Sequence, residues 1–121
     1  MEVFREQKGI QLNEINKTIL DEIRKYCRKF KKQESCGVVY FDNSTLYFLP
    51  CENISRSPEY YFLIDPVILI DYDVQYIVHS HVIGSSQPSE NDINSSNELC
   101  IPYLIYSLRD NDFFLYENIG V

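Results

Sequence analysis

The chain has 121 residues, of which 45% are hydrophobic and 14% aromatic, and its formal net charge is −7. This composition excludes a disordered tail and predicts one globular domain over residues 1–121. No apolar run approaches the roughly 18–20 residues that a membrane helix needs, and the N-terminus has no apolar signal-peptide core. We therefore expect a soluble, cytoplasmic protein with no membrane partner.

Charge is unevenly distributed along the chain. Residues 1–33 carry nine basic and five acidic side chains, whereas residues 34–121 carry two basic and thirteen acidic ones. The acidic part would repel a phosphate backbone, so we do not expect nucleic acid as a partner. The basic stretch Arg24–Lys32 is typical of a solvated helix face.

The four cysteines do not suggest a metal or redox motif. No two of them form a CxxC pair, and several have apolar neighbours. We expect free, mostly buried thiols in a reducing compartment. The cysteines are Cys27, Cys36, Cys51 and Cys100.

The first predicted element is a long helix over residues 13–32. Apolar residues between Leu12 and Phe30 recur at three- and four-residue steps, which makes one apolar stripe. Asn13 or Asn16 could cap its start, and basic residues in its last turns suit the negative end of the helix dipole.

Shorter patterns predict the remaining elements. Alternating or continuous apolar runs bounded by turn residues indicate strands, and Pro or Ser at a first-turn position indicates a helix start. We expect strands at 36–41, 46–49, 60–64, 76–78, 103–108 and 113–116, helices at 67–74 and 89–100, and a loop at 82–88. The order α-β-β-β-α-β-α-β-β predicts an α/β fold with a mixed sheet flanked by helices.

The only two histidines of the chain, His79 and His81, follow the predicted strand at 76–78. Residues two apart in an extended strand point to the same face, so the imidazoles should project together and Ser80 should point away. Two adjacent imidazoles are a natural start for a zinc site. Taken alone, however, His-x-His is also compatible with a surface or packing pair.

Ser89-Glu90-Asn91-Asp92 matches the capping-box pattern, with Ser89 as N-cap and Asp92 as the third helical residue. Both side chains would then reach back toward the start of the helix. If the strand end faces this point, Asp92 completes a His/His/Asp set and leaves one position for water. That is the form of a catalytic zinc site, although the pattern alone is compatible with a simple cap.

The combination His79-x-His81, seven residues, Ser89, two residues and Asp92 resembles the JAMM, or MPN+, family of zinc metalloproteases. The upstream glutamate of that family corresponds to Glu34, just after the first predicted helix. The resemblance runs from about residue 16 to residue 116 and looks like the bacterial and phage branch. One departure is Val82, which follows the second histidine where many members have Pro.

The resemblance implies a JAMM/MPN-type mixed sheet, related to the cytidine deaminase fold, and a zinc ion bound by His79, His81 and Asp92. It implies Glu34 as general base and Ser89 as hydrogen-bond donor to the tetrahedral oxyanion. The reaction would be hydrolysis of a peptide or isopeptide bond. The substrate would be a ubiquitin-like or sulfur-carrier tail or a phage tail protein, in a bacterium or a phage-infected host cell.

Other functions are considered beside this one. A non-enzymatic tail assembly or scaffold module could keep the same fold. A zinc-dependent nucleoside deaminase would need His-x-Glu and a downstream Pro-Cys-x-x-Cys, which this chain lacks. Cys36 as a nucleophile would have no third histidine to activate it, so we expect it to pack in the core. The oligomeric state is not indicated, and the loops at 51–60 and 82–88 are expected to carry specificity.

Overall fold

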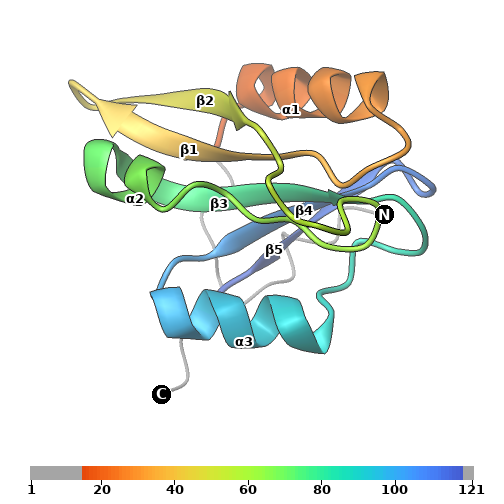
Figure 1. Cartoon of the computed structure of the whole chain (residues 1–121). Helices are drawn as coiled ribbons and strands as arrows, with labels where there is room; N and C mark the ends of the chain where they lie inside the picture. The colour runs from red at the N-terminus through yellow and green to blue at the C-terminus, as the bar shows by residue number, and fades with distance from the viewer. Residues whose placement is uncertain (1–14, 119–121) are drawn as a thin grey trace.

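The computed structural model describes residues 15–118. It is a five-stranded mixed sheet with helices on both faces (Figure 1), as the α/β prediction required. The elements in chain order are α1 (Lys17–Lys29), β1 (Cys36–Asp42), β2 (Thr45–Cys51), α2 (Val67–Asp71), β3 (Asp73–His81), α3 (Glu90–Leu99), β4 (Tyr103–Ser107) and β5 (Asp112–Tyr116).

The strand order is β2-β1-β3-β4-β5, so β3 lies in the middle of the sheet. β1 pairs antiparallel with both β2 and β3, β3 pairs parallel with β4, and β4 pairs antiparallel with β5. The parallel pair needs a crossover connection, which α3 supplies. The carboxyl end of β3 is therefore placed between the start of β1 and the end of β4.

Helix α1 covers one face of the sheet (Figure 1). The Asn16 side chain accepts a hydrogen bond from the Ile19 N–H at 2.9 Å, which confirms one of the two predicted caps. The other candidate, Asn13, lies outside the described residues. The apolar stripe buries Ile19, Ile23 and Cys27 against sheet residues of this face. The helix ends at Lys29, three residues before the predicted end.

The opposite face of the sheet carries a second, smaller apolar cluster, in which Val38, Ile77 and Ile105 are fully or almost fully buried. The segment between β2 and α2 covers part of this face. α3 lies on the same side (Figure 1), but its two buried residues are polar, Asp92 and Ser96. A helix that buries a carboxylate must give it polar or charged partners.

Gly37 explains how closely β2 approaches β1 near this face. A Cβ atom at this position would lie 2.5 Å from the Leu49 carbonyl oxygen and 2.7 Å from the Phe48 ring. Pro50, which has no N–H to donate, lies opposite Gly37 on β2, an edge strand. An edge position is where a sheet tolerates proline.

The strand predicted at 60–64 is wrong. Residues 61–65 have no regular secondary structure, and residues 58–60 form a turn. The backbone of this segment is bonded elsewhere: the Leu63 N–H donates to the Asn53 side chain at 3.1 Å, and the Leu63 carbonyl accepts from Ile54 at 2.9 Å. Tyr60 and Tyr61 are exposed, so the aromatic run reflects a surface and not a buried strand.

Two further boundaries need correction. The helix predicted at 67–74 ends at Asp71, because Asp73 and Val74 already pair with β1. The strand predicted at 76–78 extends over Asp73–His81 and therefore contains both histidines. The other strands and the helix at 89–100 lie within two residues of their predicted bounds.

The described cysteines are all free, and their burial differs. Cys27 and Cys36 are buried, Cys51 is partly buried and Cys100 is exposed. Burial raises the pKa of Cys27 and of Cys36 to about 12. Within residues 15–118, no helix has both the length and the apolar character needed to cross a membrane.

Candidate metal centre

The end of β3 directs the two imidazoles to one face of the sheet and the serine between them to the other. His79 is fully buried and His81 is partly buried. Ser80 Oγ accepts the Ser35 N–H at 2.8 Å, and the Ser80 N–H donates to the Ser35 carbonyl at 2.9 Å. This reciprocal pair joins β3 to the residue that follows Glu34, so the alternation predicted from sequence is observed.

The N-terminus of α3 faces this strand end through a complete capping box. Ser89 Oγ accepts the Asp92 N–H at 3.0 Å, and Asp92 Oδ2 accepts the Ser89 N–H at 3.0 Å. Ser89 is the N-cap and Asp92 the third helical residue, as predicted. The cap holds the Asp92 carboxylate at the start of the helix, close to β3.

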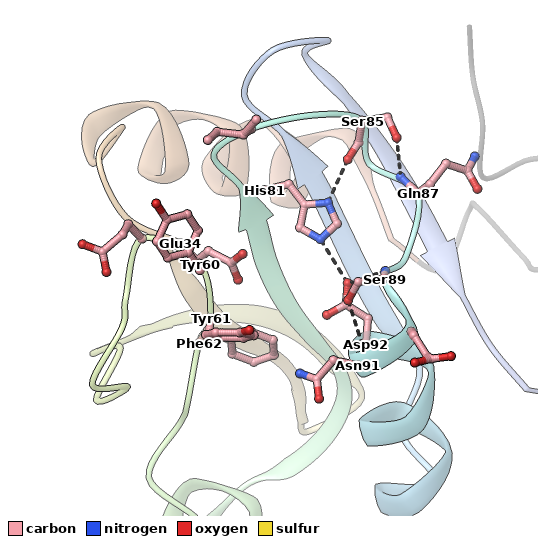
Figure 2. Close-up of a pocket in the computed structure, with 13 residues that line it drawn as sticks. Glu34, Tyr60, Tyr61, Phe62, His81, Ser85, Gln87, Ser89, Asn91 and Asp92 are labelled. Carbon is pink, nitrogen blue, oxygen red and sulfur yellow. Dashed lines mark hydrogen bonds and ion pairs between the residues drawn. The ribbon is translucent and has the colours of Figure 1, made fainter.

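The two histidines and Asp92 converge. His79 Nε2 lies 3.1 Å from Asp92 Oδ1, and His81 Nε2 lies 3.0 Å from Asp92 Oδ2. One ligand atom from each residue lies within 4.8 Å of the other two. Figure 2 shows His81 between Ser85 and Asp92, with the α3 N-terminus beside it.

The donor atoms of this cluster suit a divalent metal ion. His81 Nδ1 lies 2.8 Å from the Ser85 carbonyl, an acceptor, so Nδ1 carries the proton and leaves the Nε2 lone pair for a metal. His79 has both ring nitrogens buried, and neither makes a well-directed hydrogen bond within residues 15–118. His79 Nε2 and Asp92 Oδ1 are nevertheless only 3.1 Å apart, close enough for both to serve as ligands of one ion.

Two imidazole nitrogens and one carboxylate match the three-ligand set of open zinc sites. The residues present thus fit such an ion, and the acidic side chains around them suit a cation.

The pKa shifts of the cluster follow from burial opposed by close partners. Burial lowers the pKa of His79, which favours the neutral, ligating form. Burial also acts to lower the pKa of His81, but Asp92 and the Ser85 carbonyl outweigh it, and the net shift is upward. Burial acts to raise the pKa of Asp92, but the imidazoles and the Ser89 N–H outweigh it, so this carboxyl stays ionised.

Glu34 is buried, with 8% of its surface exposed, and it lines the same cleft as His81 and Asp92. Burial raises its pKa to about 8, with a further contribution from the negative charge of Asp92. Its backbone is held on both sides. The Glu34 N–H donates to the Pro58 carbonyl at 2.7 Å, and its carbonyl accepts from Asn53 Nδ2 at 2.8 Å.

The cleft has a volume of about 540 Å³. It is lined by Glu34, His81, Ser89 and Asp92, and its walls come from residues 59–62 and 83–91. Glu34, Tyr60 and Tyr61 belong to the wall opposite Ser89 (Figure 2). The fifth predicted residue, His79, lies beneath, with the Phe62 ring stacked on its imidazole at 4.3 Å. All five predicted site residues are thus brought together.

Three contributors to the site have no local signal in the sequence. Ser85 orients His81, Phe62 covers His79, and Asn53 holds the backbone of Glu34. Asn53 and Phe62 act through contacts with residues that are distant in the chain, and Ser85 acts through its backbone carbonyl in a loop. Asn53 and Phe62 lie within residues 16–116, the part of the chain that resembles the JAMM family. Cys36 packs in the apolar cluster with Val38 and Ile77, as expected.

Comparisons with known proteins agree with this geometry. A family model described as prokaryotic homologs of the JAB domain matches residues 16–116. The tail tip assembly protein K of Escherichia phage N15 is 33% identical over 100 residues, which are 77% of this chain and 40% of that protein. The chain therefore spans less than half the length of this curated relative.

Solved structures share the fold. A JAB1/MPN domain protein from Archaeoglobus fulgidus has a TM-score of 0.56 and 21% identity, covering 99% of this chain and 92% of its own. A protein from Desulfitobacterium hafniense has a TM-score of 0.65 and 22% identity, covering 87% of this chain and 84% of its own. At these identities the likeness concerns the fold alone.

Proposed function

Since the chain belongs to the prokaryotic homologues of the JAB domain, we propose that it is a zinc-dependent metallopeptidase that hydrolyses a peptide or isopeptide bond. One observation carries the proposal: the His79, His81 and Asp92 ligand atoms converge in a cleft that also holds the buried carboxyl of Glu34. A structural metal site would be closed by a fourth protein ligand. Here the space beyond the cluster is an open cleft.

The proposed ligands His79, His81 and Asp92 would hold Zn²⁺, which supplies the Lewis acidity that lowers the pKa of bound water toward about 7. Glu34 is the general base. It accepts a proton from the attacking water and delivers it to the leaving amine, a role that needs a carboxylate near the metal but not bound to it. Burial suits this role. It raises the pKa of Glu34 to about 8 in the metal-free protein, and the positive charge of a bound ion would lower this pKa toward neutral pH, where the side chain can both accept and donate a proton.

Ser89 is the proposed oxyanion donor. Its Oγ accepts the Asp92 N–H, so the orientation of the hydroxyl is set by the helix cap. A hydroxyl has one hydrogen to donate as well as two lone pairs, and this hydrogen can reach a substrate oxygen in the cleft. Such a donor stabilises charge that develops only in the transition state.

The proposed substrate is a protein, either a phage tail protein or a ubiquitin-like or sulfur-carrier tail, met in a bacterial or phage-infected cytoplasm. The similarity to a tail tip assembly protein supports the first of these. The same similarity favours a second candidate function, a tail assembly module that keeps the fold and the metal without cleaving. The buried Glu34, which lines the cleft together with His81 and Asp92, favours hydrolysis over this alternative, because an unused buried carboxyl only costs stability.

The deciding experiment compares wild type with Glu34→Gln, both loaded with zinc. The substrates are tail proteins from the same genome and ubiquitin-like tail fusions, and cleavage is followed by mass spectrometry. We expect wild type to cleave one of them and Glu34→Gln to lose about 100- to 10,000-fold in rate while keeping its zinc. Equal cleavage by both proteins contradicts the assignment of the base. Zinc-loaded wild type that binds a tail protein without cleaving it supports the assembly function instead.

A further inference from the structure

A second pocket, of about 250 Å³, lies beside the cleft and differs from it in chemistry. One wall is the segment after Tyr61, with the apolar side chains of Phe62, Leu63 and Ile64. The other wall is the face of α3 that carries Ser95 and Leu99. Ile77 and Tyr103 from the sheet, and Pro66 and Leu69, also line the pocket. No step of the proposed hydrolysis uses this pocket.

The pocket adjoins the cleft. Phe62 and Asn91 line both. The Phe62 ring stacks on His79 at 4.3 Å and meets the Tyr103 ring edge-on at 5.8 Å. Tyr103 also meets the His79 ring edge-on at 5.5 Å, so two aromatic rings that line the pocket contact a proposed metal ligand. An extended peptide advances about 3.3 Å per residue, so a substrate in the cleft would reach the pocket within about two residues of the scissile bond.

We infer that this pocket is a specificity subsite that takes one large aliphatic side chain, such as Leu, Ile or Met, of the substrate. This inference rests on the proposed function, because it takes the substrate to be a protein that is cleaved in the adjoining cleft. The volume is below the range of pockets for drug-sized ligands and suits one side chain. Leu63 and Leu99 stand 52% and 43% exposed on its two walls, so an aliphatic occupant would remove apolar surface from water.

Charge excludes an acidic occupant. Glu98 stands on the α3 wall of the pocket, and the adjoining cleft is lined by Glu34, Glu59, Glu90 and Asp92. Among the described residues that line the two cavities, none is Lys or Arg. An Asp or Glu side chain entering here would lose its hydration next to like charges without gaining a Lys or Arg side chain as partner. The subsite therefore selects for aliphatic and against acidic residues.

The first test measures binding and does not depend on catalysis. N-acetyl-leucine N-methylamide is titrated into the protein, and amide resonances of Leu63, Ser95 and Leu99 are followed by NMR. The matched probe is the corresponding aspartate derivative. We expect saturable shifts at these residues with the leucine probe, in the millimolar range, and none with the aspartate probe. Absence of saturable shifts with the leucine probe, or equal shifts with both probes, overturns the inference.

Two variants complete this test. Ser95→Trp would fill the pocket from the α3 wall and should abolish the leucine response. Asn94→Trp introduces the same side chain one residue away at an exposed position and should leave the response intact. A response that survives Ser95→Trp places the probe elsewhere and overturns the assignment. The assignment is also overturned if the same resonances broaden with rising protein concentration in the absence of any probe. Such broadening would show that a second copy of the chain occupies the pocket.

The second test connects the pocket with cleavage. A peptide library is incubated with zinc-loaded wild type, Ser95→Trp and Asn94→Trp, and the cleaved bonds are mapped by mass spectrometry. We expect an aliphatic residue to be enriched about tenfold or more at one position within two residues of the bond, and Ser95→Trp alone to lose this preference. Cleavage without such a preference overturns the subsite and leaves the peptidase standing. No cleavage by wild type counts against the peptidase, and the leucine probe then decides the subsite alone.

Discussion

Ser89 and Asp92 hold each other in place at the start of α3, each accepting the backbone N–H of the other at 3.0 Å. The oxygen that Asp92 uses for this bond, Oδ2, is also the one 3.0 Å from His81 Nε2. One local motif thus fixes both a proposed metal ligand and a proposed oxyanion donor. The cost of holding a carboxylate in the buried cluster is offset by the hydrogen bonds of a helix cap.

Metal binding gives the first prediction. We expect about one zinc per chain, and His79→Ala and Asp92→Ala should lose it. Asp42→Ala removes an exposed carboxylate at the end of β1 that lies farthest from the histidines and is the matched control, so it should keep the metal. The measurements are metal analysis and the melting temperature before and after chelation, since a bound ion at 1,000 times its Kd stabilises by about 4 kcal/mol. Retention of stoichiometric zinc by Asp92→Ala would show that this residue is not a ligand.

Glu34→Gln should stabilise the metal-free protein, and more at pH 8 than at pH 4.5. Burial raises the pKa of Glu34 from 4.5 to about 8. The folded protein thus favours the protonated carboxyl. Below pH 4.5 Glu34 is protonated in both the folded and the unfolded chain and costs no stability. As the pH rises from 4.5 to about 8, the unfolded chain loses the proton first, so the wild type loses stability over this range. Gln resembles the protonated form at every pH, so the advantage of the variant should grow across this window.

The measurement is denaturant unfolding of chelator-treated wild type and Glu34→Gln at both pH values. The free energy of unfolding of Glu34→Gln minus that of wild type should be larger at pH 8 than at pH 4.5 by roughly 2–4 kcal/mol. This range assumes about 1.4 kcal/mol per pKa unit and a discount for partial solvation. Glu59→Gln, at an exposed position of the same cleft, is the control and should show no such change. A constant stability difference between wild type and Glu34→Gln at the two pH values would contradict the raised pKa.

Ser89→Ala should lose both stability and activity, for separable reasons. Loss of the N-cap costs about 1 kcal/mol of unfolding free energy. Loss of the oxyanion donor should reduce the cleavage rate by about 100- to 1,000-fold. Asn16→Ala removes the cap of α1, which is remote from the cleft, and should lose similar stability with little change in rate. Equal rate losses in the two variants would mean that Ser89 acts only through the helix.

Asn53→Asp tests how the base is positioned. Asn53 Nδ2 donates to the carbonyls of Glu34 at 2.8 Å and Tyr61 at 2.9 Å. An aspartate cannot donate there, and its charge would face both carbonyls, so a loss of about 1–3 kcal/mol is expected. Zinc content should not change, because the proposed ligands come from β3 and α3. The control is Asn43→Asp, the same change in the exposed β1–β2 turn, which should cost less than about 0.5 kcal/mol. Loss of zinc in Asn53→Asp would argue for a wider structural role.

Local geometry made much of the site predictable. A strand period of two places His79 and His81 on one face, and a capping box turns Asp92 back toward the helix start. Both inferences need only neighbouring residues, and the structure places these side chains accordingly. The position of Glu34 needed the JAMM-like pattern, because no local rule brings a residue at the start of β1 to the end of β3.

The errors arose where the outcome depends on tertiary partners. Residues 60–64 have the aromatic and β-branched composition of a strand. None of these residues pairs with a strand among residues 15–118, and Asn53 satisfies part of their backbone instead. The helix predicted at 67–74 is shortened for a related reason. Pairing of Asp73 and Val74 with β1 extends the central strand, which outweighs the local helical preference.

The proposed metal ligands all lie within residues 79–92, whereas Glu34 reaches the site through pairing of β1 with β3. A short connection closes at little entropic cost, whereas the position of Glu34 depends on pairing between strands that are distant in the chain. In evolutionary terms they are separable. A descendant could replace Glu34, keep the proposed metal ligands His79, His81 and Asp92, and gain stability from the loss of a buried acid. A peptidase domain could then become a non-catalytic tail assembly domain through one substitution at Glu34, with the fold unchanged.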